Sequence, residues 1–386
     1  MTKTVTIEAI AAEATEWRQD IHRHPELQYD VHRTAAKVAG LLRDFGCDEV
    51  VEGIGQTGVV GVIKGRPGAR AIAMRADMDA LPITEQTGAA YASTVPGKMH
   101  ACGHDGHTAM LLGAAKNLAV SRDFDGKAVV VFQPAEEGGG GARAMVQDGM
   151  MERFAIDEVY GLHNMPGLAP GHFGIRPGSI MASSDIFDIE ITGKGGHAAK
   201  PDACIDTVVV AAQIVTALQT IVSRNVDPIK SAVVSVTAIE VGEAYNVIAQ
   251  TCRMRGTARS LEPGVRDLLE KRIVEVVELT AQALGARATA RYSRHYPVVQ
   301  NHGVQTGFCA DVARQIAGIA HVDADAAPMM GAEDFAFMLE ARPGAFIFMG
   351  NGKSAGLHHP AYDFNDAIIP SGIAYWTRLA QARLTA

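Results

Sequence analysis

The chain has 386 residues, of which 47% are hydrophobic and 20% are charged, and its 35 basic and 43 acidic side chains leave a formal net charge of −8. This length suits two domains better than one, and the apolar content is enough for a buried core, which excludes a disordered protein. No basic stripe is present, so we expect no binding to nucleic acid. Apolar runs such as residues 208–212 are too short to span a membrane, so no membrane role is expected.

The N-terminal segment and the cysteines indicate a cytoplasmic protein. Acidic and polar residues interrupt the first twenty positions, whereas a secretory signal has a basic start and an unbroken apolar stretch. The cysteines are odd in number and widely spaced, which is typical of a reducing compartment and not of a disulfide framework. They are Cys47, Cys102, Cys204, Cys252 and Cys309.

Short apolar strands alternate with helices in the first 181 residues. The first forty residues have helical spacing, with a break near His24 and Pro25, and a further helix is expected over 108–120. The expected strands are 58–63, 71–74, 128–132 and 158–162. Continuous apolar strands between helices predict an α/β fold with a mostly parallel sheet and helices on both faces.

The pattern changes near residue 182, where strands with alternating polarity begin. Strands are expected at 186–191, 232–239, 251–258 and 286–292, with helices at 207–222 and 263–284. This β-α-β-β-α-β order is the split βαβ arrangement of an α+β domain. A helix at 306–316 and a strand at 345–349 then resume the earlier style. We therefore predict one domain from residues 1–181 and 297–386, interrupted by a smaller domain at 182–296.

Four loops carry side chains that bind divalent metals. Cys102 and His104 lie two residues apart before a predicted helix, Glu136 and Glu137 follow the strand 128–132, and His163 and His358 follow two further strand regions. Cys, His and carboxylate are the usual ligands of borderline metals. If the Cys102 thiolate bridges, each of two metals receives three protein ligands and keeps open positions for water and substrate, as a catalytic site requires.

Other readings of these residues are less complete. Single histidines and a solvated acidic turn are common structural features, and Cys102 could instead be a covalent nucleophile with a histidine partner. That alternative leaves the two glutamates and His163 without a role. Residues 352–356 match G-x-S-x-G, but they lack the helix and the later acid and histidine that a nucleophile elbow needs.

Together and in order, seven motifs resemble those of the aminoacylase/carboxypeptidase superfamily of di-metal hydrolases, in the branch of hippurate hydrolases, N-acyl-L-amino acid amidohydrolases and auxin-conjugate hydrolases. The motifs are His24–Leu27, Arg75–Pro82, Met99–His107, Gln133–Glu137, Gly195–Ala199, Gly331–Phe335 and His358–Pro360. The resemblance runs nearly end to end. It implies a metal-dependent hydrolase of N-acyl amino acids, with a metal-dependent dipeptidase or carboxypeptidase as the related alternative.

The resemblance also implies roles for individual residues. Cys102, His104, Glu137, His163 and His358 would hold two divalent ions (Zn, Mn, Co or Ni), with Glu136 as general base and Asp79 steadying the site. Asp77 stands where peptidase relatives carry a ligand His, a donor that His104 would replace.

In the inserted domain, the family's lid or dimerisation domain, the resemblance implies that His197, Asn246 and Arg259 contact the substrate, and that the chain forms a homo-oligomer, either dimer or tetramer. His197 acts in some relatives across the subunit boundary. The family's Asn-x-Ile-Pro reads Asn-Val-Ile-Ala at 246–249, and Asp202 stands where His is usual. Both departures put the substrate preference in question.

Overall fold

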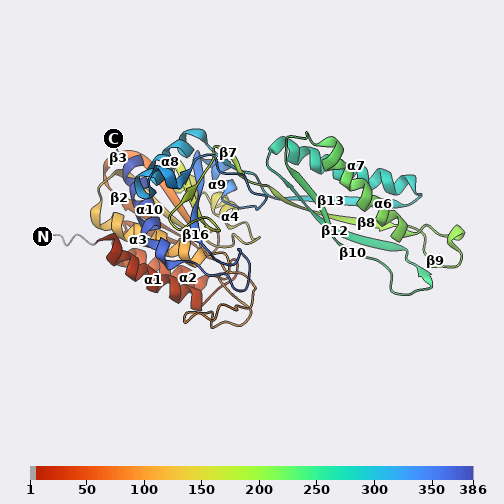
Figure 1. Cartoon of the computed structure of the whole chain (residues 1–386), viewed down its shortest axis with the longest axis horizontal. Coiled ribbons are helices and arrows are strands. Elements are labelled where there is room, and N and C mark those ends of the chain that lie inside the picture. Colours follow the sequence, from red (N-terminus) through yellow and green to blue (C-terminus); the bar gives the residue numbers. More distant parts are fainter. Residues whose placement is uncertain (1–5, 386) are drawn as a thin grey trace. The chain divides into compact units, whose positions relative to one another are not determined.

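A computed structural model describes residues 6–385, and these residues form two compact units (Figure 1). Unit 1 contains the described residues through Ile180, Gln300–Ala327 and the described residues from Asp334 onward. Unit 2 contains Met181–Val299 and Pro328–Glu333. The sequence placed the boundaries after residues 181 and 296 and did not separate the short segment 328–333 from the larger domain.

The sheet of unit 1 has the strand order β1-β2-β4-β3-β5-β16-β6-β15. Its strands are β1 (Glu49–Ile54), β2 (Gly58–Lys64), β3 (Arg66–Asp77), β4 (Asp125–Gln133), β5 (Glu158–Pro166), β6 (Phe173–Gly174), β15 (Val322–Asp323) and β16 (Gly344–Gly352). The four central strands β4, β3, β5 and β16 are parallel, whereas β1 and β2 run antiparallel at one edge. The predicted mostly parallel sheet is confirmed, and its central strands end at one edge.

Both faces of this sheet are buried. Ala128, Val130 and Phe132 of β4 belong to the main apolar core, while the alternate residues Val129 and Val131 are equally buried on the opposite face. The main core is completed by five long helices: α1 (Ile7–Arg23), α2 (His32–Asp44), α3 (His104–Ser121), α8 (Gly303–Ala317) and α10 (Ile369–Arg383). Unit 1 also contains the short α-helices α4 (Gly141–Gln147), α5 (Met150–Arg153) and α9 (Ala336–Ala341). Of these, α4 contacts both β4 and α9.

Unit 2 is the predicted split βαβ fold. Its antiparallel sheet has the order β10-β12-β8-β13, built from β8 (Ser184–Thr192), β10 (Ala232–Glu240), β12 (Thr251–Ser260) and β13 (Arg287–Tyr296). Phe187, Ile189 and Ile191 of β8 are buried with α6 (Thr207–Thr220) and α7 (Pro263–Ala283), while the residues between them are exposed. A second small sheet pairs β9 (Gly196–His197) with β11 (Val247–Ile248). The chain passes between the units within β7 (Gly178–Met181), within β14 (Val299–Asn301) and at the two ends of the segment Pro328–Glu333.

One helix of unit 2 is apolar enough to need comment. The segment Thr207–Asn225, which is α6 with one further turn, could cross a membrane by length and composition alone. Val210, Ile214 and Leu218 nevertheless lie in the core of unit 2, at the spacing of a helix packed on a sheet.

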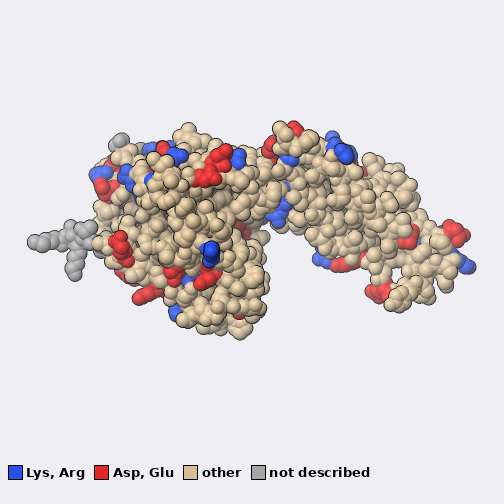
Figure 2. Space-filling model, viewed as in Figure 1, with Lys and Arg blue, Asp and Glu red and all other residues tan. Residues whose placement is uncertain are grey.

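On the face of the molecule seen in Figure 2, acidic and basic side chains are interspersed, without a large patch of one sign.

Candidate metal centre

The backbone between Cys102 and His104 turns sharply because Gly103 adopts a φ of +90°. A Cβ atom at Gly103 would lie 2.3 Å from the side-chain nitrogen of Asn164 and 2.5 Å from the Tyr362 hydroxyl, so only glycine fits. His104 is the first residue of α3, which begins four residues earlier than the sequence predicts. The turn thus places the Cys102 thiol and the His104 imidazole next to each other.

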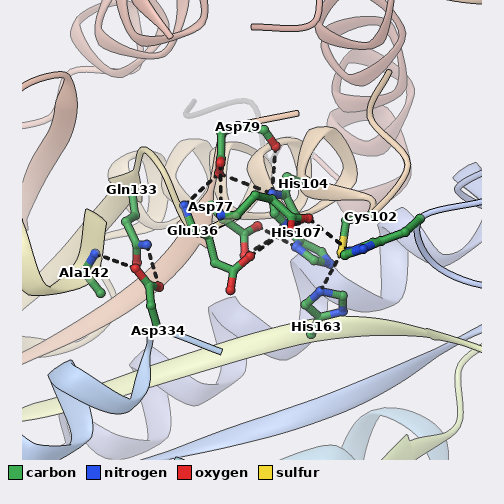
Figure 3. Close-up of polar contacts among 12 residues, drawn as sticks. Asp77, Asp79, Cys102, His104, His107, Gln133, Glu136, Ala142, His163 and Asp334 are labelled. Carbon is green, nitrogen blue, oxygen red and sulfur yellow. Dashed lines mark hydrogen bonds and ion pairs between the residues drawn. The ribbon is translucent and has the colours of Figure 1, made fainter. Parts of the chain in front are cut away.

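The five predicted metal ligands come together as two groups that share Cys102. Ligand atoms of Cys102, His104 and His163 lie within 4.8 Å of one another, and so do those of Cys102, Glu137 and His358. Cys102 Sγ is 3.4 Å from His163 Nε2, and Glu137 Oε1 is 3.2 Å from His358 Nε2. The donors come from four chain segments of unit 1, and several of them are labelled in Figure 3.

The histidine hydrogen bonds leave the right nitrogens for metal binding. His163 donates from Nδ1 to the Asn164 carbonyl at 2.7 Å, and burial holds its pKa well below the usual value, so Nε2 offers a lone pair toward Cys102. His104 donates from Nδ1 to the Asp79 carbonyl at 2.8 Å. Its buried Nε2 has no hydrogen-bond partner among the described residues. Imidazoles held in this way by backbone carbonyls are typical of metal ligands.

The electrostatics around His104 favour a positive charge. Its Nε2 lies 3.7 Å from Asp77 Oδ2 and 4.0 Å from a carboxylate oxygen of each of Glu136 and Glu137. Although burial lowers the pKa of His104, Asp77 and Cys102 outweigh it and raise the pKa well above the usual value. Burial, followed by the charge of Glu137, raises the pKa of the Cys102 thiol, which therefore needs a cation to become a thiolate. The donor set fits divalent metal ions.

Asp79 holds the two adjacent glutamates in place. Its carboxylate oxygens accept the backbone N–H groups of Glu136 at 3.0 Å and Glu137 at 3.1 Å (Figure 3). Burial raises the pKa of Asp79, partly offset by His104. Glu136 is itself buried, and the nearer of its carboxylate oxygens is 4.0 Å from His104 Nε2. The geometry thus places the Glu137 carboxylate among the metal donors and the Glu136 carboxylate beside them.

A supporting network of hydrogen bonds was not predicted from the sequence. His107 donates from Nδ1 to Asp77 at 2.7 Å and accepts the Asn164 backbone N–H on Nε2 at 2.9 Å. The second oxygen of Asp77 pairs with Arg75 at 2.7 Å. Although burial raises the pKa of Asp77, His104 and Arg75 outweigh it and hold the pKa well below its usual value. One signal was present in the sequence: His107 lies three residues after His104, on the same side of a helix.

The three predicted substrate contacts belong to unit 2, whereas the metal donors belong to unit 1. His197 pairs with Val247 across the small β9–β11 sheet, and the backbone carbonyl of Asn246 accepts the Ala198 N–H at 3.0 Å, so His197 and Asn246 are close in this sheet. Both are exposed. Arg259 lies on β12, on a different sheet, and is half-buried. The structure thus groups two of the three.

Known proteins match this chain along nearly its whole length. A family model described as peptidase family M20/M25/M40 matches residues 73–382. The chain is 42% identical over 363 residues to hippurate hydrolase from Campylobacter jejuni and 38% identical over 364 residues to N-acetylcysteine deacetylase from Bacillus subtilis, covering 94% of both chains in each comparison. A solved dinuclear metal-binding peptidase of the M20 family from Bacillus subtilis is similar with a TM-score of 0.86 and 34% identity, over 98% of this chain and 99% of that one.

Proposed function

The chain belongs to peptidase family M20/M25/M40, and from this premise we propose that it is a metal-dependent amidohydrolase that cleaves N-acyl amino acids. The observation that carries the proposal is the pair of three-donor groups that share Cys102, with the buried Glu136 beside them. A cysteine nucleophile would not need a second histidine, a glutamate and a further histidine around its thiol. The names of the relatives, which include a hippurate hydrolase and a deacetylase, support N-acyl amino acids as substrates over peptides.

In this proposal Cys102, His104 and His163 would hold one divalent ion, and Cys102, Glu137 and His358 would hold the other. Such ions lower the pKa of water and polarise an acyl oxygen. Glu136 takes a proton from the attacking water and delivers it to the departing amine nitrogen. Asp79 keeps Glu136 and Glu137 in place through their backbone amides. The thiolate and imidazole ligands suit Zn, Co or Ni, and Mn is the fourth candidate.

We assign to unit 2 the role of a lid or dimerisation domain in a homo-oligomer. There His197 would donate a hydrogen bond to the acyl oxygen, an interaction typically worth about 3–4 kcal/mol in the transition state. Asn246 and Arg259 would also contact the substrate. The guanidinium of Arg259 would hold the carboxylate of the substrate. A His197→Ala variant should keep its metal and lose turnover, and unchanged turnover would remove unit 2 from the mechanism.

Sedimentation velocity tests whether the chain forms a dimer or a tetramer. All five cysteines are free, which supports a cytoplasmic location.

The deciding experiment measures hydrolysis of hippurate, N-acetyl-methionine and indole-acetyl amino acids before and after exhaustive chelation, with Zn, Mn, Co or Ni added back. We expect activity to vanish and return with metal. A Glu136→Gln variant should keep its metal content and lose about 10²–10⁴-fold in kcat. The exposed Glu16→Gln serves as the matched control. Activity that survives chelation would favour Cys102 as a nucleophile, and an active Glu136→Gln would exclude Glu136 as the base.

A further inference from the structure

A cleft of about 630 Å³ opens beside the metal donors of unit 1. One of its walls is Glu137, which belongs to a three-donor group. The lining residues are Leu27, Gln28, Tyr29, Asp30, Ala80, Leu81, Pro82 and Glu137. Clefts of this size accommodate small organic ligands. The first four of these residues begin at the end of the His24–Leu27 motif, to which the mechanism above gives no role.

The walls of this cleft are joined by hydrogen bonds. The Ala80 N–H donates to the Glu26 carbonyl at 2.8 Å, and the Ala135 N–H donates to the Gln28 carbonyl at 3.2 Å. Gln28 and Ala135 both have positive φ, at 48° and 52°, a strained backbone that surrounding contacts must hold. The Tyr29 hydroxyl donates to the Gly139 carbonyl at 2.9 Å. The cleft is therefore bounded by segments fixed to the site and not by a free loop.

The side chain of Glu26 explains how the motif builds this wall. Its carboxylate accepts the backbone N–H groups of Arg33 at 3.0 Å and Thr34 at 2.8 Å, at the beginning of α2. These are N–H groups that a helix cannot satisfy internally, and a negative charge there is favourable. Glu26 thus anchors the segment to α2, and the next residue, Leu27, lines the cleft.

The chemistry of the lining distinguishes the two halves of an N-acyl amino acid. Leu27, Leu81 and Pro82 are apolar, and Tyr29 adds an aromatic ring. Among the described residues that line the cleft, none is Lys or Arg, and Asp30 is an acid that no metal would neutralise, whereas Glu137 would be bound to a metal. The amino acid half carries a carboxylate, which finds no basic side chain in this lining and which Asp30 would repel. The acyl half is uncharged and gains from apolar burial.

We propose that this cleft is the acyl-group subsite, that it selects bulky apolar acyl groups over acetyl, and that Leu27, Tyr29 and Leu81 determine this specificity. The inference rests on the proposed amidohydrolase function and goes beyond it by naming the substrate class. The carboxylate of the substrate must then find its cation outside the cleft. Because one methylene in an apolar pocket changes kcat/KM by about tenfold or more, N-benzoylglycine should exceed N-acetylglycine by at least about tenfold.

The test compares kcat/KM for these two substrates in the metal-loaded wild type and two variants. Leu27→Trp fills the cleft and should lower the ratio of kcat/KM for N-benzoylglycine to that for N-acetylglycine by about tenfold, because the larger acyl group loses more space. Leu27→Ala keeps the backbone and should lower the ratio less, through lost contact. Ile319→Trp, an exposed position of unit 1, is the matched control and should leave the ratio unchanged. A ratio that both Leu27 variants leave unchanged would overturn the assignment.

A measurement without turnover separates this inference from the proposed function. Saturation-transfer NMR on the metal-loaded protein should detect benzamide more strongly than acetamide, and Leu27→Trp should abolish the difference. If the wild type hydrolyses neither substrate but this binding pattern holds, the proposed function fails and the apolar cleft stands. If hydrolysis is metal-dependent but benzamide binding is indifferent to Leu27→Trp, the subsite is wrong and the proposed function stands.

Discussion

At the scale of single residues, the arrangement of Asp79 leads to a specific prediction. Each of its carboxylate oxygens accepts one backbone amide, from Glu136 and from Glu137. Asn at this position has only one acceptor oxygen, so one amide loses its partner and the adjacent carboxylates shift. We expect Asp79→Asn to lose about 10–100-fold in kcat or metal affinity, as is usual for residues that support metal ligands. Steady-state kinetics and calorimetric metal titration measure this.

The exposed Asp188→Asn on β8 provides the control, because it changes the same chemistry away from the donors. If Asp79→Asn retained full activity and metal affinity, Asp79 would not position the two glutamates. A lower melting temperature of Asp79→Asn without a change in kcat or metal affinity would mean that Asp79 contributes to folding alone.

Individual residues of the site were predictable to different degrees. Cys102, His104, Glu137, His163 and His358 are metal-ligand types in loops that follow strands or precede a helix, and the structure brings all five together. The acceptor role of His107 toward Asn164 depends on the pairing of α3 with β5, a contact between residues 57 positions apart. Nothing in the local sequence distinguishes such a histidine from a ligand. Only the three-dimensional contacts show which nitrogen is occupied.

At the scale of elements, α1 and α3 are joined by a buried charged network. Arg18 and His22 of α1 both contact Asp105 in the first turn of α3, at 2.8 Å each, and all three side chains are fully buried. His22 also lies 3.3 Å from Glu85. Removing one partner from such a buried network leaves an unpaired charge, which is strongly destabilising. The network thus fixes the start of α3, where His104 lies.

The network predicts a loss of stability at alkaline pH. Although burial lowers the pKa of His22, Asp105 and Glu85 outweigh it, despite the opposing charge of Arg18, and raise the pKa from 6.5 to about 9. A histidine with a raised pKa in the folded state stabilises fully below pH 6.5, and this contribution is lost as the pH rises through 9. The shift corresponds to about 3 kcal/mol. Urea unfolding between pH 6 and 9.5, with chelator present, should show this decline in the wild type.

Comparison with two variants isolates His22 from other titrating groups. His22→Gln should be less stable than the wild type at pH 6, and the difference should shrink toward pH 9.5. The exposed His32→Gln should follow the wild type throughout. A constant difference between His22→Gln and the wild type across this range would mean that the charge of His22 does not contribute.

Whole elements were predictable where their own residues carry the pattern. The alternation of buried and exposed residues in β8 matches the predicted half-exposed strand. The helix α10 was not predicted, although Pro370 in its first turn and buried Ile369, Ile373 and Trp376 have the spacing of a helix start and its apolar face. The antiparallel edge of β1 and β2 was missed for a different reason. Strand direction depends on pairing partners far along the chain, which a local pattern does not specify.

At the scale of the whole molecule, the predicted metal ligands come from four segments separated by up to 256 positions, from Cys102 to His358, and all lie in unit 1. Binding only to the folded state stabilises the parts that supply the ligands. Hydrogen exchange measured with and without metal should therefore slow in the first turn of α3, around His163 in β5 and around Glu137 and His358. Strands β8 and β12 of unit 2 supply no donor and should exchange at the same rate in both samples.

A His163→Ala sample exposed to the same metal gives the background for this experiment, because it lacks one donor of the first group. We expect less protection in that variant throughout unit 1 and again no change in unit 2. If metal addition slowed exchange in β8 and β12 as much as in unit 1, metal binding would also stabilise unit 2. In that case the two units would not respond independently, and the donors of unit 1 alone would not account for the effect of the metal on the folded chain.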